Sequence, residues 1–162
     1  IEASFAIKYD TEKKVFYFYS SDFMNSGWVT LTETQLNSLK NTLDKYIEWE
    51  KLAIEKEVKI EKEFPDSKIS TDVTWKFGDE WYFSKRLDVY FKFFSQNTTR
   101  HQFILYSNKV NSSSNEFIDY KIEPFYFDKK QIEDLMRGIS EESINTAIDK
   151  FNQRKSIENQ FK

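Results

Sequence analysis

Residues 28–39 read WVTLTETQLNSL, and this stretch decides the fold because it joins the end of a strand to the start of a long helix. Residues 28–31 have the composition of a short strand. Thr32 and Gln35 have the spacing of a capping box, in which each side chain accepts a hydrogen bond from a backbone amide at the helix start. The helix is therefore predicted to begin at Glu33.

The apolar residues that follow recur at helical spacing and define one stripe: Leu36, Leu39, Leu43, Ile47, Ile54 and Val58. Residues 48–63 are dense in Glu and Lys, and Glu55 precedes Lys59 by four residues, the favoured orientation for a helical ion pair. We predict one helix of about 30 residues that ends at Phe64-Pro65. The charged tract 48–63 is expected to be a solvated face rather than a partner-binding one.

Residues 124–135, PFYFDKKQIEDL, repeat this joint, with Asp128 as the cap and Gln131 three residues later. The likeness has two explanations. One is a degenerate internal repeat with halves 1–64 and 68–162. The other is that two unrelated segments share a strand-to-helix connection that many folds use. The second is favoured because only the Gln and the last Leu are identical between the two joints.

Segments with two-residue alternation or aromatic runs are predicted to be strands: 4–9, 15–19, 28–31, 69–77, 81–83, 87–94, 101–107 and 117–127. After the second joint we expect a short helix that ends at Gly138 and another capped by Ser140. The order β-β-β-α-β-β-β-β-α-α predicts an α+β fold, an antiparallel sheet of about six to seven strands with helices on one face. A length of 162 residues fits a single domain, 1–162.

The composition excludes several kinds of site. Without cysteine there are no disulfides, thiolate nucleophiles, zinc fingers or iron–sulfur clusters. Three glycines, Gly27, Gly78 and Gly138, cannot build a phosphate-cradling loop or a dinucleotide fingerprint. His101, the sole histidine, follows Arg100 at the start of a strand and is expected to be a solvated turn residue. These observations predict a protein that is not an enzyme and holds no cofactor or metal.

The longest apolar run, 15–19, is far shorter than the roughly 20 residues that a membrane helix requires, so no membrane span is expected. The chain starts at Ile1 and lacks cysteine, which favours an exported protein, whether periplasmic, surface-bound or secreted. A cytoplasmic protein is the alternative. The abundance of Lys, Asn, Ile and Phe indicates an AT-rich genome, and we expect a bacterium or its phage.

Two hypotheses for function remain, and the first is a non-enzymatic protein that binds a protein partner. Its Tyr and Trp residues exceed what strand alternation needs, and both residue types are typical of interface hot spots. The candidate binding surface combines aromatic and basic residues from 81–94 and the turn that follows: Trp81, Tyr82, Lys85, Arg86, Tyr90, Lys92 and Arg100.

The second hypothesis is binding of single-stranded nucleic acid. Strands followed by a helix, twice in one chain, and a joint of the L-T-x-x-Q-L type at 31–36 resemble the Whirly and Pur-alpha group. The resemblance implies strands that stack bases on aromatic side chains. A groove that follows a nucleic acid strand is basic, whereas this chain has a net charge of −3. Nucleic acid is therefore the alternative, and a protein partner is the first expectation.

Overall fold

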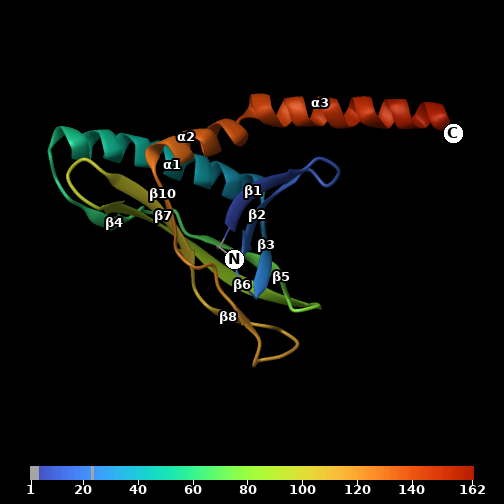
Figure 1. Ribbon diagram of the computed structural model, residues 1–162, viewed down its shortest axis with the longest axis horizontal. Helices are drawn as coiled ribbons and strands as arrows, with labels where there is room; N and C mark the ends of the chain where they lie inside the picture. The colour runs from blue at the N-terminus through green and yellow to red at the C-terminus, as the bar shows by residue number, and fades with distance from the viewer. Residues whose placement is uncertain (1–3, 23) are drawn as a thin grey trace.

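The computed structural model describes residues 4–22 and 24–162, which form a curved antiparallel sheet with helices along one side (Figure 1). The main path of the sheet follows the order β1-β2-β3-β5-β6-β7-β10. The bounds of these strands, in that order, are Ser4–Asp10, Val15–Ser21, Asn25–Leu31, Ile69–Phe77, Glu80–Ser95, His101–Ser107 and Phe125–Phe127. The succession of strands, helix, strands and two helices confirms the predicted α+β fold.

Strand β6 is the longest strand and accounts for the curvature of the sheet. It merges the predicted segments 81–83 and 87–94. Its first part pairs with β5, and its second part pairs with β7 on one side and with the short strand β4, Glu61–Glu63, on the other. The register of β5 against β6 shifts between Thr71 and Val73. Because such a bulge bends and twists its strand, the sheet curls like half of a barrel (Figure 1).

Helix α1, Glu33–Glu55, lies along the concave side of the sheet and begins where the sequence predicts. The amide of Gln35 donates to Oγ1 of Thr32 at 3.2 Å, and the amide of Thr32 donates to Oε1 of Gln35 at 2.9 Å. The predicted capping box is thus confirmed. The helix buries one face: Leu36, Leu39, Thr42, Leu43, Tyr46, Glu50 and Ala53.

The end of α1 differs from the prediction of a single helix that reaches Phe64. The helix stops at Glu55, and β4 follows. The Ser95 amide donates to the carbonyl of Ile60 at 2.9 Å, and the Phe64 amide donates to the carbonyl of Phe91 at 3.1 Å. Pairing with β6, together with burial of Phe64 at 4% exposure, therefore overrides the helix propensity of the Glu/Lys tract.

Aromatic side chains fill the concave side of the sheet, beneath α1 and, at Trp75, beneath Tyr120. The largest of those fully buried are Trp75, Tyr46, Phe18, Phe91, Phe93 and Phe103. His101 belongs to this core, since it is 3% exposed and its ring lies 5.5 Å from that of Phe93. Its Nδ1 is 2.7 Å from Oγ of Ser95, and its Nε2 is 3.2 Å from the carbonyl oxygen of Thr98. The expectation of a solvated His101 is wrong, because the protein interior satisfies both ring nitrogens.

Two further helices follow β10. In α2, Lys129–Gly138, the second predicted capping box is present: the Gln131 amide donates to Oδ1 of Asp128 at 3.1 Å, and the Asp128 amide donates to Oε1 of Gln131 at 2.9 Å. Helix α3, Glu141–Glu158, is capped by Ser140 and extends away from the sheet (Figure 1). Within the described ranges, no helix has the length and apolar character needed to cross a membrane.

The segment 117–127 is not the single strand that its sequence predicts. Strand β9, Asp119–Tyr120, pairs with β8, Val110–Asn111, in a separate two-stranded sheet. Only β10 joins the main sheet, where it pairs with β7. A short 3-10 helix, Asn159–Phe161, follows α3.

Candidate functional site

The outer face of the sheet, on the side away from α1, carries aromatic side chains that do not belong to the core. In β2 the ring of Phe18 is buried, while Tyr17 and Tyr19 point to the outer side. Strand β3 alternates in the same way, with Val29 buried and Trp28 outside. Both sides of these strands are therefore used, one for the core and one for the outer surface.

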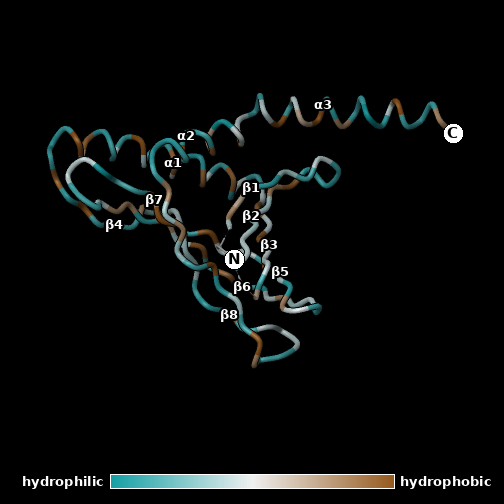
Figure 2. Tube along the Cα trace, viewed as in Figure 1, coloured by the Kyte–Doolittle hydropathy of each residue, from teal (hydrophilic) through white to brown (hydrophobic). Residues whose placement is uncertain are grey.

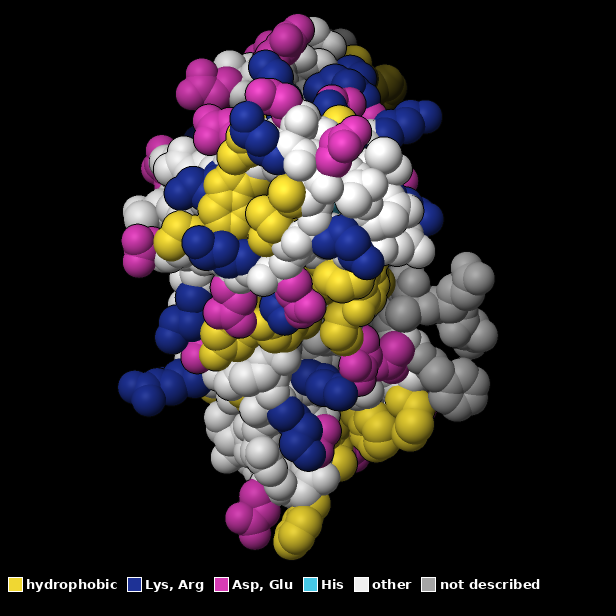
Figure 3. Space-filling model, turned by 90° about the vertical axis from the view of Figure 1, so that its left-hand side faces the viewer, with side chains coloured by type: hydrophobic (Ala, Val, Ile, Leu, Met, Phe, Trp, Pro, Cys, Tyr) yellow, Lys and Arg dark blue, Asp and Glu magenta, His cyan; other side chains and the backbone are white. Residues whose placement is uncertain are grey.

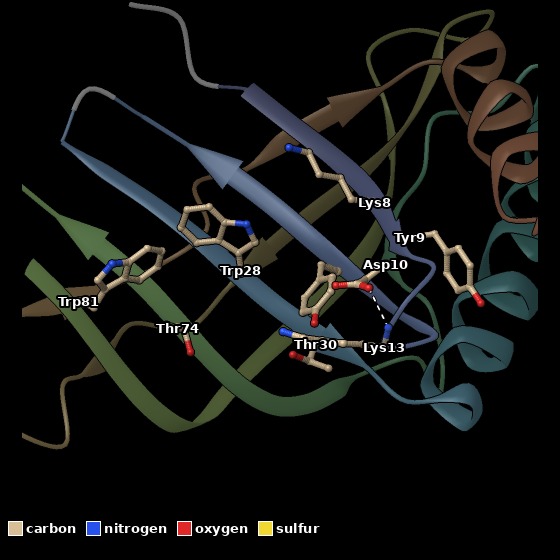
Figure 4. Close-up of a pocket in the computed structure, with 9 residues that line it drawn as sticks. Lys8, Tyr9, Asp10, Lys13, Trp28, Thr30, Thr74 and Trp81 are labelled. Carbon is tan, nitrogen blue, oxygen red and sulfur yellow. Dashed lines mark hydrogen bonds between the residues drawn. The ribbon is translucent and has the colours of Figure 1, made fainter. Parts of the chain in front are cut away.

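Three of the outer rings form a continuous aromatic row across the sheet: Tyr19, Trp28 and Trp81. The ring centroid of Trp28 lies 5.0 Å from that of Tyr19 and 5.0 Å from that of Trp81. Tyr19 and Trp28 are direct partners in the register of β2 and β3, and Trp28 is paired with Thr74 of β5. Because Thr74 is small, the ring of Trp81 on β6 reaches across β5 to meet Trp28 (Figure 4).

A cation lies at the β1 end of the aromatic row. Nζ of Lys8 is 4.2 Å from the ring centroid of Tyr19, which is within the range of a cation–π contact. Hydrogen bonding with Ser26, then with Ser21, lowers the pKa of the Tyr19 phenol, and the charge of Lys8 lowers it further. This end of the row therefore offers a positive charge, hydroxyl groups and an aromatic face together.

An acidic side chain, Asp79, lies near the other end of the row. Trp81 is 57% exposed, while the preceding Glu80 accepts a hydrogen bond from the Tyr82 hydroxyl at 2.7 Å on the other face of β6. Asp79, in the turn before β6, forms an ion pair of 3.7 Å with Lys76. The surroundings of the row thus change from basic beside β1 to mixed charge beside β6.

A cleft of about 620 Å³ runs beside the row and is lined by Lys8, Tyr9, Asp10, Lys13, Tyr17, Trp28, Thr30, Thr74 and Trp81 (Figure 4). Small-molecule sites commonly occupy about 300 to 1,000 Å³, so the cleft is large enough to receive part of a ligand. The Asp10 carboxylate accepts hydrogen bonds from the amides of Glu12 at 3.0 Å and Lys13 at 2.8 Å. This carboxylate therefore holds the β1–β2 turn in place.

The residues predicted as a binding surface lie at several places along β6. Trp81 belongs to the aromatic row. The neighbouring Tyr82 faces the core side, where its ring lies 6.0 Å from that of Trp75. Lys85 and Arg86 are exposed and occupy the bulge, beside the register shift of β5 against β6.

The remaining predicted residues lie towards the far end of β6. Tyr90 stacks on Tyr106 with 5.4 Å between ring centroids, Lys92 forms a 2.9 Å ion pair with Glu61, and Arg100 lies in the turn before β7. Eleven residues separate Trp81 from Lys92, which at about 3.3 Å each amounts to roughly 36 Å along the strand. The structure therefore does not bring the predicted residues together on one surface.

The predicted binding surface did not include Lys8, Tyr19 or Trp28. They come from three strands that are far apart from Trp81 in the chain, and only the register of the sheet unites them. A usable signal was present, because strand β2 has aromatic residues at both odd and even positions. One set must face away from the core, and that set marks the outer surface.

A second concave surface lies between the end of α1 and β4. It is an apolar groove of about 420 Å³ lined by Trp49, Leu52, Ala53, Lys56, Val58, Ile60, Lys62 and Phe93. Figure 3, which faces this end of the molecule, shows hydrophobic side chains gathered among lysines. The tract 48–63 also contains the buried Glu50, whose carboxylate pairs with Lys129 at 3.2 Å. Residues 54–63 are all exposed, as the predicted solvated face requires, and the buried Glu50 is an exception to it.

The aromatic row can stack planar or apolar groups, and the hydroxyls and ammonium beside it can donate hydrogen bonds. In the described parts of the chain, no group of three or more His, Asp or Glu side chains is placed to hold a metal ion. The chain matches no protein-family model, no curated protein sequence and no solved structure. The resemblance to the Whirly and Pur-alpha group therefore stays a prediction.

Proposed function

We propose that this chain is a non-enzymatic binding protein that holds a protein partner on the aromatic row and in the cleft beside it. The observation that carries the proposal is the row itself, in which Tyr19, Trp28 and Trp81 are in ring contact on the side of the sheet away from the core. Trp81, at 57% exposure, keeps a large apolar surface in water. Contiguous exposed aromatic surface of this kind is typical of interaction sites, and Tyr and Trp are favoured at interface hot spots.

The charges around the row support a protein rather than a polyanion. Lys8, Asp10 and Lys13 line the cleft at one end, and Asp79 pairs with Lys76 in the turn before β6 at the other. A protein partner can present complementary charges to both ends, which fixes its orientation and raises specificity. A nucleic acid strand laid along the whole row would bring its phosphates towards the carboxylates of Asp10 and Asp79.

Affinity capture from an extract of the source organism tests this proposal. We expect Trp81→Ala to lose proteins that the unchanged chain retains. Phe117→Ala is the matched control, because Phe117 is 86% exposed and lies in the loop between β8 and β9, outside the row. The same set of captured proteins from the Trp81→Ala variant and the unchanged chain would rule out the row as the binding surface.

Single-stranded nucleic acid is the second candidate ligand, and the contact between Lys8 and Tyr19 favours it. A cation beside a stacking ring is typical of platforms that bind single strands. We expect no binding of a labelled oligonucleotide at about 50 mM salt if the partner is a protein. Binding that weakens steeply with salt and is lost in Lys8→Gln and Trp81→Ala would replace the protein proposal with this one.

A further inference from the structure

We propose that α3 pairs with α3 of a second copy of this chain in an antiparallel arrangement, so that the protein is a dimer. The helix leaves the body of the protein soon after it starts (Figure 1). Ile144 packs against the core and lines a pocket together with Leu36 and Lys40 of α1, whereas every residue of α3 in the described chain is exposed or half-buried. This inference does not depend on the aromatic row.

A helix that extends away from the sheet gains little stability from packing against the rest of its own chain. Isolated helices are marginal in water, and most helical stability in proteins comes from packing an apolar face. Ile144, Ile148 and Phe151 are half-buried and follow one another at steps of four and three residues, the spacing of a helix–helix seam. Figure 2 shows hydrophobic positions recurring along the helix between hydrophilic turns. The seam thus has apolar residues that stay partly exposed and could be buried against another helix.

The charges on α3 identify a second copy as the occupant. The acidic residues Glu141, Glu142 and Asp149 lie in the first half. The second half carries Lys150, Arg154 and Lys155, followed by Lys162, with Glu158 as its one acid. The helix dipole favours such charges only in the first and last turns, so it does not account for Asp149 and Lys150 in the middle. An acidic half and a basic half on one helix are complementary to the same helix running the other way.

The positions of the charges also fix the register. Glu141 lies seven residues before Ile148 and Lys155 lies seven residues after it, which at roughly 100° per residue places both on the same side of the helix as Ile148. A two-fold axis beside Ile148 therefore places Glu141 of one copy opposite Lys155 of the other. Ile148 of one copy then lies opposite Ile148 of the other at the two-fold axis, as the isologous interface of a symmetric dimer requires. A parallel pair would instead place like charges side by side.

Sedimentation of the full chain at about 100 µM tests the dimer, because an interface with a micromolar Kd is almost fully formed there. We expect a dimer for the unchanged chain and a monomer for Ile148→Asp. Ile157→Asp is the matched control: Ile157 is 56% exposed, and nine residues at roughly 100° each place it on the opposite side of the helix from Ile148. A monomeric unchanged chain, or a dimer that survives Ile148→Asp, would overturn the proposal.

A charge exchange tests the antiparallel register. The variants E141K and K155E are each expected to be monomeric, because like charges then face each other in the homodimer. An equimolar mixture of the two restores opposite charges at both ends and is expected to form the mixed dimer. Failure of the mixture to associate, or dimers of either variant alone, would contradict the pairing.

Discussion

The ring of Phe5 lies 5.2 Å from the ring of Phe125, centroid to centroid, although their strands β1 and β10 stand at opposite ends of the sheet order. Phe5 also lies 5.5 Å from Phe18 and 5.5 Å from Phe127. Aromatic packing therefore holds the two edges of the curled sheet near each other. This contact encloses the concave face and leaves the convex face, with its aromatic row, open to partners.

Phe5→Ala tests the contribution of this contact to stability. We expect the free energy of unfolding to fall by about 2 kcal/mol, less than for a fully buried Phe because Phe5 is only half-buried. Urea denaturation measures the change. Phe117→Ala removes the same side chain from an 86% exposed position and is expected to leave stability unchanged. Equal effects of the two substitutions would contradict the packing role of Phe5.

Gly27 is required by the close approach of Tyr120. A Cβ atom at position 27 would lie 2.1 Å from the Tyr120 hydroxyl oxygen, so Gly27→Ala forces the ring to move. The expected loss of stability is about 1 to 3 kcal/mol, the usual range for overpacking. In a Tyr120→Ala background the clash is absent, and the same substitution is expected to have a much smaller effect. Simple additivity of the two changes would show that the clash is not the cause.

Tyr120 also predicts how stability depends on pH. Burial raises the pKa of its phenol from 10.0 to about 12, and its hydroxyl oxygen lies 2.5 Å from Oγ of Ser20. The folded state therefore holds the phenol proton more tightly than the unfolded state does. The stabilisation is fully present below about pH 10 and is lost as the pH rises towards 12.

Tyr120→Phe removes this titration and the hydrogen bond to Ser20. Near pH 8 we expect the variant to be less stable by about 1 kcal/mol, the net value of a buried hydrogen bond. The difference from the unchanged protein is expected to narrow near pH 11, since only the unchanged protein loses stability by ionising Tyr120. Urea denaturation at the two pH values gives the comparison, and a constant difference would contradict the prediction.

Substitutions in the N-terminal capping box of α1 are expected to lower the free energy of unfolding without changing partner binding. Thr32→Ala should lower the free energy of unfolding by about 1 kcal/mol, while Thr32→Ser keeps the hydroxyl and is the matched control. Gln35→Ala is expected to be more harmful than removal of a cap alone, because Nε2 of Gln35 also donates to the carbonyl of Ser70 at 3.0 Å. Loss of binding by a stable Thr32 variant would show that this joint belongs to the site.

The parts of the fold that local chemistry determines could be predicted from the sequence. Thr32 with Gln35 and Asp128 with Gln131 mark both helix starts correctly, because a cap depends on residues three positions apart. The end of α1 could not be predicted in this way. The tract 48–63 has helix-forming residues throughout, and the pairing of β4 with β6 is a long-range contact that overrides them.

The candidate site was only partly predictable for the same reason. Trp81 could be selected as an exposed aromatic residue, but its neighbours in the row, Tyr19 and Trp28, depend on the register of β2, β3 and β5. His101 shows the converse error. Its polar neighbours in the sequence suggested solvent, whereas its contacts with Phe93 and Ser95 place it in the core.

Photo-crosslinking at the aromatic row is the most direct test of the central claim that this row is the binding surface. Phe83 is 37% exposed on β6, and its register partner Thr74 is also the partner of Trp28. A benzophenone amino acid at position 83 is expected to give discrete protein adducts in an extract of the source organism, which disappear when Trp81→Ala is added. The same amino acid at position 117 is expected to give none of these adducts. Identical adducts at both positions, or adducts at 83 that survive Trp81→Ala, would contradict the claim.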